Sequence, residues 1–231
     1  MRVRAELVRL RRDLSQVQHD FDSARAAQLL EANEHLMLAA LRAETLAEMA
    51  VSDLGALARA SQRDALTGTP NRALMLDRLE SAVTLARRRG TRTAVLFLDL
   101  DDFKQVNDTL GHAVGDAVLQ LVARRAESMV RDSDTVSRHG GDEFLVLLTE
   151  VSQASDAALI AAKLLAAVAA PSRIGEHELR LSASLGIAIY PEDGDSPDTL
   201  IGRADAAMYR AKKDGRGWFR FHDEAIFKAG E

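Results

Sequence analysis

The first 62 residues restrict the fold of this chain most strongly, because they contain no proline and a single glycine, Gly55. Alanine, leucine, arginine, glutamate and glutamine are abundant there, and all of them favour helices. The apolar residues follow alternating steps of four and three. They form one seam through Val3, Leu7, Leu10, Leu14, Val17 and Phe21, and a second through Leu29, Ala32, Leu36, Ala39, Ala43, Leu46, Ala50 and Leu57. Such seams are typical of helices that pair as coiled coils.

The two seams are out of phase. The step from Ala24 to Leu29 is five residues, which predicts a stutter, a bend or a helix break within 22–28. Asp22-Ser23 would cap a second helix after a break. We favour a parallel dimeric coiled coil over a helical hairpin packed on its own globular domain, because the pattern extends over several heptads.

The composition excludes several classes of protein. The chain has no cysteine, so disulfide scaffolds, thiolate zinc sites and cysteine nucleophiles are excluded. A net charge of −5 gives no overall basic field for nucleic acid, and 4% aromatic residues are few for a base-stacking surface. No apolar run approaches the ~20 residues of a membrane helix. We therefore expect a cytoplasmic protein with neither a nucleic-acid partner nor a membrane segment.

From about residue 63 the pattern becomes mixed, so we expect two parts, a helical segment over 1–62 and a globular domain over 63–231. Strands that alternate with helices around one hairpin predict a single sheet with helices on one face. The helices are expected at 70–88, 102–108, 114–130, 156–170 and 197–213, and the strands at 93–99, 135–138, 144–148, 179–190 and 218–222.

Two acidic segments carry the chemistry. Asp99 and Asp101 follow the apolar run 93–98, where a buried carboxylate is costly unless it meets a cation; the alternative is an ordinary acidic turn. The second segment, 140–144, reads Gly-Gly-Asp-Glu-Phe before another apolar run. Its glycines permit positive φ and close approach of a ligand. The alternative, a polar hairpin tip, favours Asn-Gly or Asp-Gly.

If these segments are neighbours in one sheet, their carboxylates meet at one edge. Ligands that are all oxygen favour Mg²⁺ or Mn²⁺. Clustered carboxylates that hold two such ions are typical of phosphoryl transfer.

The same residues show a resemblance to a known family. Gly140-Gly141-Asp142-Glu143-Phe144 resembles the signature of GGDEF diguanylate cyclases, and four further motifs match that family in order and spacing over about 62–223. They are DALTGTPNR at 64–72, DLDDFKQVNDTLGHAVGD at 99–116, SLGIA at 184–188 with Tyr190-Pro191, and DAAMYRAK at 205–212 with Gly215-Arg216.

The resemblance implies an α+β, nucleotidyl-cyclase-like and ferredoxin-related domain, with a central antiparallel-type sheet flanked by helices. It implies condensation of two GTP into cyclic di-3′,5′-GMP (c-di-GMP) with release of two pyrophosphates, across a homodimer in which each domain holds one GTP. It also implies two Mg²⁺ or Mn²⁺ ions per active site.

Individual roles are also implied by the resemblance. The implied metal ligands are Asp99, the Leu100 carbonyl, Asp142 and Glu143; the implied catalytic residues are Asp142, Glu143 and Lys104. Whether Asp142, Glu143 or neither is the general base stays open. The implied GTP contacts are Asn107 and Asp116 for guanine, His112, Phe103, Leu66 and Gly141 for the pocket, and Lys104, Lys212 and Arg216 for the triphosphate. Phe103 would serve equally as core, His112 as a turn residue, and Lys212 as a partner of the helix dipole.

The resemblance extends to an inhibitory product site. Arg131 and Asp134 match the R-x-x-D pattern of the family, with five residues between Asp134 and Gly140, and Lys163 is the best candidate for a second basic residue. A lysine lacks the two-pronged geometry of arginine, which would weaken the site. The alternatives are a catalytically inactive GGDEF domain that serves as a c-di-GMP or GTP receptor, and an oligomerisation adaptor.

Overall fold

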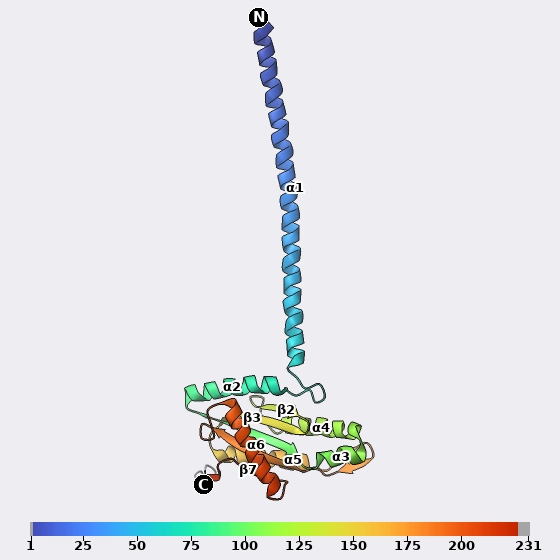
Figure 1. Cartoon of the computed structure of the whole chain (residues 1–231), viewed down its shortest axis with the longest axis vertical. Coiled ribbons are helices and arrows are strands. Elements are labelled where there is room, and N and C mark those ends of the chain that lie inside the picture. The colour runs from blue at the N-terminus through green and yellow to red at the C-terminus, as the bar shows by residue number, and fades with distance from the viewer. Residues whose placement is uncertain (1, 226–231) are drawn as a thin grey trace. The chain divides into compact units, whose positions relative to one another are not determined.

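The computed structural model describes residues 2–225 (Figure 1). In helix α1 (Arg2–Ser61), side chains are described at 10, 12, 14–19, 21, 23, 25, 28–30 and 33–51. The chain divides into two compact units, Met1–Ala58 and Arg59–Glu231. Within the described residues, no helix combines the length and the apolar character that a membrane span requires.

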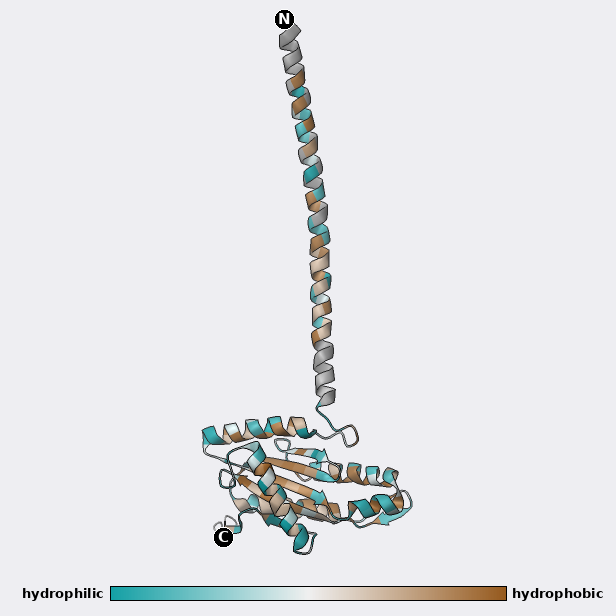
Figure 2. Ribbon diagram, in the orientation of Figure 1, coloured by the Kyte–Doolittle hydropathy of each residue, from teal (hydrophilic) through white to brown (hydrophobic). Residues whose placement is uncertain are grey.

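Helix α1 runs for 60 residues without a break through 22–28. The predicted helix break and the helical hairpin are therefore wrong, whereas a stutter shifts an apolar seam without interrupting a helix. Apolar residues recur along the described part of α1 (Figure 2), and Phe21 and Leu36 are 64% and 67% exposed. The seam residues Val3, Leu7, Ala24, Ala32 and Leu57 lie outside the described side chains. Pairing of two helices stays a prediction.

The second unit is built on a five-stranded sheet. The strands are β1 (Arg92–Leu100), β2 (Thr135–Gly140), β3 (Glu143–Val151), β6 (Ala183–Tyr190) and β7 (Phe219–Phe221), in the order β2-β3-β1-β6-β7. All neighbours are antiparallel except β6 and β7, which are parallel. Strand β1 is central and is buried from Thr93 to Leu100.

Helices cover both faces of this sheet (Figure 1). On one face, α4 (His112–Glu127) and α5 (Ala154–Ala169) enclose Leu96 and Leu98 of β1. On the other, α2 (Arg72–Arg89) and α6 (Pro197–Lys213) enclose Val95 and Phe97. The prediction of helices on one face only is wrong, because an uninterrupted apolar strand presents hydrophobic side chains to both sides.

The predicted strand 179–190 is also wrong in its first part. Leu179 ends β5 (His177–Leu179), which pairs with β4 (Ser172–Ile174) in a separate two-stranded sheet, and β6 begins only at Ala183. Two strands of three residues contain too little alternation to be recognised in a sequence. The other predicted helices and strands of this unit are present, with ends that differ by up to three residues.

Helix α6 lies unusually close to the sheet at Gly186 of β6. A Cβ atom at this position would lie 1.9 Å from the Ala204 carbonyl oxygen and 2.2 Å from the Met208 nitrogen. Both are backbone atoms of α6, so no side-chain rotation relieves the overlap. Gly186 therefore sets how near α6 comes to β6.

Replacing Gly186 by alanine is expected to destabilise the domain by about 1–3 kcal/mol or more, since α6 must move away from the sheet. Gly202 is the matched control, because it lies in α6 itself and nothing lies within 4 Å of a Cβ atom added to it. Gly202→Ala should stabilise by about 0.5–1 kcal/mol. Urea denaturation of both variants checks the pair, and equal effects would contradict the close approach at Gly186.

Candidate active site

The two acidic segments meet at one edge of the sheet. The register of β1 and β3 places Asp99 directly opposite Glu143. Asp142 lies in the turn between β2 and β3, and its carbonyl accepts a hydrogen bond from the Leu100 nitrogen at 3.4 Å. Opposed residues of antiparallel strands have Cβ atoms about 4.5–5.5 Å apart. The fold therefore brings together the four residues that the sequence suggests as metal ligands.

Asp99 is the buried member of this group, with an exposed fraction of 7%. Its Oδ1 atom is buried and accepts no hydrogen bond. Lys212 from the last turn of α6 places its Nζ 2.5 Å from this oxygen, as an ion pair outside hydrogen-bonding geometry. Burial raises the pKa of Asp99; Asp142 and Asp101 add to the rise, and Lys212 opposes it.

Glu143 shares this environment. Burial raises the pKa of Glu143, and the charges of Asp99, Asp142 and Asp205 raise it further, while Lys212 lowers it. Several carboxylates thus repel one another around one lysine.

A hard divalent cation fits these residues. The buried Asp99 oxygen already meets one cation, the Lys212 ammonium, and the ligand atoms that the neighbouring residues offer are all oxygens, the set that Mg²⁺ and Mn²⁺ prefer. Within the described residues, no three histidine or acidic side chains already converge into a metal-binding cluster. The expected set contains three acidic side chains, Asp99, Asp142 and Glu143, together with the Leu100 carbonyl, so these side chains would have to draw together around a bound ion.

Six of the predicted GTP contacts lie on α3 (Phe103–Leu110), in the first turns of α4 and in the loop before α2; Gly141, Lys212 and Arg216 lie in the turn before β3, in α6 and in the loop after α6. Phe103 belongs to the core, which was the alternative role predicted for it, and Asn107 is half-buried. Lys104, His112 and Asp116 are exposed. The Leu66 carbonyl accepts a hydrogen bond from Gln120 Nε2 at 3.1 Å, which holds the loop on α4.

Gly115 is a site residue to which the sequence analysis assigned no role. A Cβ at position 115 would lie only 1.9 Å from Asn107 Oδ1, so the side chain of Asn107 rests on the bare backbone of α4. Any larger residue at 115 would displace Asn107. Gly115 is part of the motif at 99–116, but the reason for a glycine there is the contact between α3 and α4, which the sequence does not show.

Asp101 has a different role from Asp99. Its carboxylate accepts hydrogen bonds from Ser182 Oγ at 2.5 Å, Ser184 Oγ at 2.7 Å and the Gly217 nitrogen at 3.2 Å. These bonds join the end of β1 to β6 and to the loop after α6. That loop contains Arg216, whose Nη1 lies 3.6 Å from Asp102 Oδ2.

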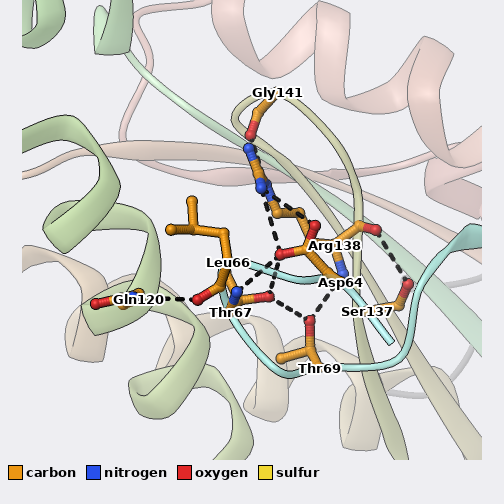
Figure 3. Close-up of polar contacts among 8 residues, drawn as sticks. All are labelled: Asp64, Leu66, Thr67, Thr69, Gln120, Ser137, Arg138 and Gly141. Atoms are coloured by element: carbon orange, nitrogen blue, oxygen red, sulfur yellow. Dashed lines mark hydrogen bonds and ion pairs between the residues drawn. The ribbon is translucent and has the colours of Figure 1, made fainter. Parts of the chain in front are cut away.

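Arg138 of β2 connects the loop before α2 to the turn 140–143 between β2 and β3, which we call the signature turn (Figure 3). The Arg138 guanidinium pairs with Asp64 and also donates to the Gly141 carbonyl. His139, the next residue, packs edge-on against Phe97 with ring centroids 5.6 Å apart. Burial lowers the pKa of His139, Arg72 lowers it further, and Asp205 acts in the opposite direction.

The residues suggested for the inhibitory site line one cavity of about 410 Å³ between the segment 128–134 after α4, β3 and α5. Arg131, Asp134 and Lys163 all line it. The Asp134 carboxylate is held by the Arg131 nitrogen at 3.2 Å and by the nitrogen and hydroxyl of Thr149, at 3.2 and 3.3 Å. The three residues therefore line the same cavity, although Lys163 is distant from the other two in the sequence, and their role as an inhibitory site stays a prediction.

Comparison with known proteins decides the family. The family described as "Diguanylate cyclase, GGDEF domain" matches residues 61–217. The chain belongs to the GGDEF family. It is 50% identical over 163 residues to the bifunctional diguanylate cyclase/cyclic di-GMP phosphodiesterase MucR of Pseudomonas aeruginosa, covering 71% of this chain and 24% of MucR. It is 45% identical over 162 residues to diguanylate cyclase TpbB of the same species, covering 70% of this chain and 37% of TpbB.

Solved structures agree. The GGDEF domain of TpbB superposes with a TM-score of 0.69 at 43% identity, covering 72% of this chain and 98% of that one. The coiled coil and GGDEF domain of DgcB from Caulobacter crescentus, in complex with c-di-GMP, gives 0.69 at 27% identity, covering 80% and 98%. The predicted α+β cyclase-like fold is confirmed. The chain spans about a quarter to a third of the two curated relatives.

Replacing Glu143 by glutamine is expected to raise the melting temperature of the metal-free protein at pH 7. A carboxyl whose pKa is raised by folding binds its proton more tightly when folded, so its ionised form destabilises the fold. The gain should vanish as the pH falls through the raised pKa of Glu143, where the wild type becomes protonated too.

Thermal unfolding between pH 4 and 8 measures this effect. Glu80→Gln, at an exposed position of α2, is the control and should change little. A melting temperature for Glu143→Gln below that of the wild type at pH 7 would show that the carboxylate stabilises the fold, contrary to the repulsion described above.

Proposed function

We propose that this chain is a diguanylate cyclase, which condenses two GTP into c-di-GMP and releases two pyrophosphates. The observation that carries the proposal is the buried Asp99 opposite Glu143, beside Asp142 and in contact with Lys212. The relatives named diguanylate cyclase support it. An inactive receptor is less well supported, because each acid and base that the family pattern requires is present.

The acidic residues of the site would bind metal ions, and the basic residues would bind the triphosphate. Asp99, Asp142, Glu143 and the Leu100 carbonyl would hold Mg²⁺ or Mn²⁺, two ions per site, which when bound neutralise the triphosphate and lower the pKa of the attacking 3′-hydroxyl. Lys104, Lys212 and Arg216 would bind the phosphate oxygens. The Lys212 ammonium already lies beside Asp99, and it would therefore be close to the phosphate oxygens of a nucleotide held by a metal at Asp99.

Guanine recognition would fall to Asn107 and Asp116. A carboxylate accepts from both N1–H and the 2-amino group of guanine, and adenine lacks this pair of donors. Leu66, Phe103, His112 and Gly141 would enclose the base and ribose. In the chemical step, a 3′-oxygen in one domain forms a bond to the α-phosphorus held by the other, pyrophosphate leaves, and the hydroxyl proton is lost to Asp142, Glu143 or water.

Replacement of Asp142 by alanine should lower c-di-GMP synthesis by at least about a hundredfold, or ~2.7 kcal/mol in the barrier, because a metal ligand is lost. The variant should stay folded, since the residue lies in a turn. Asp77→Ala, at an exposed position of α2, should keep full activity. Mass spectrometry of the GTP reaction measures both, and activity of Asp142→Ala above about a tenth of wild type would contradict the metal assignment.

Product feedback is part of the proposal. The cavity is lined by two cations, Arg131 and Lys163, and by three carboxylates, of which Asp134 is the one that the family pattern assigns to guanine. Arg131 and Lys163 would bind phosphate, and Asp134 would accept from guanine. The solved complex of the DgcB coiled coil and GGDEF domain with c-di-GMP supports product binding by proteins of this architecture.

We further propose that α1 pairs in parallel with α1 of a second copy and thereby controls how often two domains meet. Linking two domains raises their effective concentration. The exposed apolar residues of α1 support pairing, since burying them from water is favourable. The residues from about 63 onward would then be the catalytic domain, and 1–62 the dimerisation segment, of a cytoplasmic homodimer.

Removing residues 1–57 should leave a domain whose rate rises with the square of its concentration, while the rate of the full chain stays nearly linear. Inserting two residues in the last turns of α1 should rotate each domain by about 200° and change activity sharply. Inserting seven keeps the heptad phase and should restore activity. Equal turnover for all these proteins across a concentration series would show that α1 is a passive spacer.

A further inference from the structure

The segment between α1 and α2 is a compact turn organised by Asp64. The Asp64 carbonyl accepts from the Gly68 nitrogen at 2.9 Å, and its nitrogen donates to the Thr69 carbonyl at 2.8 Å. Its Oδ1 accepts from the nitrogen and hydroxyl of Thr67, at 2.8 and 2.7 Å. Residues 62–71, which we call the entry loop, therefore have a defined shape immediately after α1.

Arg138 connects the entry loop to the signature turn (Figure 3). Its Nη1 lies 3.3 and 3.2 Å from the two carboxylate oxygens of Asp64, and its Nε donates to the Gly141 carbonyl at 2.8 Å. The Arg138 and Asp64 side chains are only 16% and 22% exposed. One rigid, planar group thus binds two segments at once, so the position of one restricts the position of the other.

The Asp64 side chain is ionised at neutral pH. Burial alone would raise the pKa of Asp64, but the hydrogen bonds from Thr67 and the charge and hydrogen bonds of Arg138 outweigh it, and the pKa lies below its usual value. At neutral pH the contact is therefore a full ion pair, stronger than a bond between neutral groups.

The contact to Gly141 matters because the next residue in the chain is Asp142. Gly141 has a φ of +53° and is preceded by Gly140, so this backbone is intrinsically flexible. The Gly141 carbonyl belongs to the same planar peptide unit as the Asp142 nitrogen. A bond to that oxygen therefore restricts the direction in which Asp142 leaves the turn.

We propose that Arg138 is the positioning residue for Asp142, and that its ion pair with Asp64 makes the geometry of the metal-binding turn depend on the entry loop. The inference rests on the proposed function, in which Asp142 is a metal ligand. It assigns the entry loop a task beyond connecting two helices: a change of its shape reaches Asp142 through one side chain.

A change of the Arg138 side chain leaves the loop attached by backbone contacts. The Arg138 nitrogen lies 3.2 Å from the Pro70 carbonyl and 3.3 Å from Thr69 Oγ1, and neither contact uses the guanidinium. Arg138→Lys keeps the charge but has one donor nitrogen in place of the separate Nε and Nη1 that bind Gly141 and Asp64, so it cannot hold both in the same geometry. Asp64→Asn keeps an oxygen for Thr67 but removes the charge.

The test compares Arg138→Lys, Asp64→Asn and the double variant in the full chain. Arg78→Lys is the matched control, because Arg78 of α2 also bonds to β2, through Nη1 to Thr135 Oγ1 at 2.8 Å, away from the signature turn. Two quantities are measured: the Mg²⁺ concentration that gives half-maximal GTP turnover, and amide hydrogen exchange of residues 137–144.

Both single variants should raise the Mg²⁺ requirement about tenfold, the usual effect of removing a group that orients a metal ligand. Turnover at saturating Mg²⁺ should recover much of its wild-type value, and exchange of 137–144 should accelerate. The double variant should be no worse than the stronger single one, because both remove the same contact. Arg78→Lys should change neither quantity.

An unchanged Mg²⁺ requirement or unchanged exchange in Arg138→Lys, relative to Arg78→Lys, would overturn the proposal. Fully additive effects in the double variant would also overturn it, since the two residues would then act separately. If the wild type makes no c-di-GMP, the proposed function fails; exchange and calorimetric Mg²⁺ titration of the same variants still decide whether Arg138 positions the turn.

Discussion

The arrangement of the candidate active site follows from the burial of one carboxylate. Asp99 lies near the end of the central strand β1, which is enclosed on both faces, and a charge in such a place needs a cation. Lys212 supplies one from α6, and α6 reaches the sheet closely only because Gly186 has no side chain. Gly186 thus sets how close α6 lies to the sheet, and this position of α6 brings Lys212 to Asp99 at the sheet edge.

The same edge is electrostatically unfavourable without a metal. Burial and mutual repulsion raise the pKa of both Asp99 and Glu143, which means that their charged forms oppose folding. Groups arranged in this way at a strand end are common where charge serves catalysis rather than stability. The surrounding hydrophobic core, with apolar layers above and below the sheet, compensates for this cost.

Much of this could be predicted from the sequence, and the omissions have physical reasons. Periodicity located the helices and main strands, and the motifs suggested Asp99, Asp142 and Glu143. The uninterrupted apolar run of β1 indicates burial on both faces, but it does not show which helices cover each face. The roles of Asp101, Gly115 and Arg138 also escaped, since each depends on a partner that the sequence does not show to be in contact: Ser184, Asn107 and Asp64.

The contacts of Arg138 suggest how a helix with no part in the chemistry would affect it. In the proposed reaction two domains must meet, so α1 would act first through the encounter of its two copies. The entry loop adds a second route within one chain, because its carboxylate and the Gly141 carbonyl share one guanidinium. The two routes differ in what they change: encounter alters the dependence of rate on protein concentration, whereas the loop alters the affinity for metal. A signal that acts on α1 would therefore leave a different kinetic trace according to the route it takes.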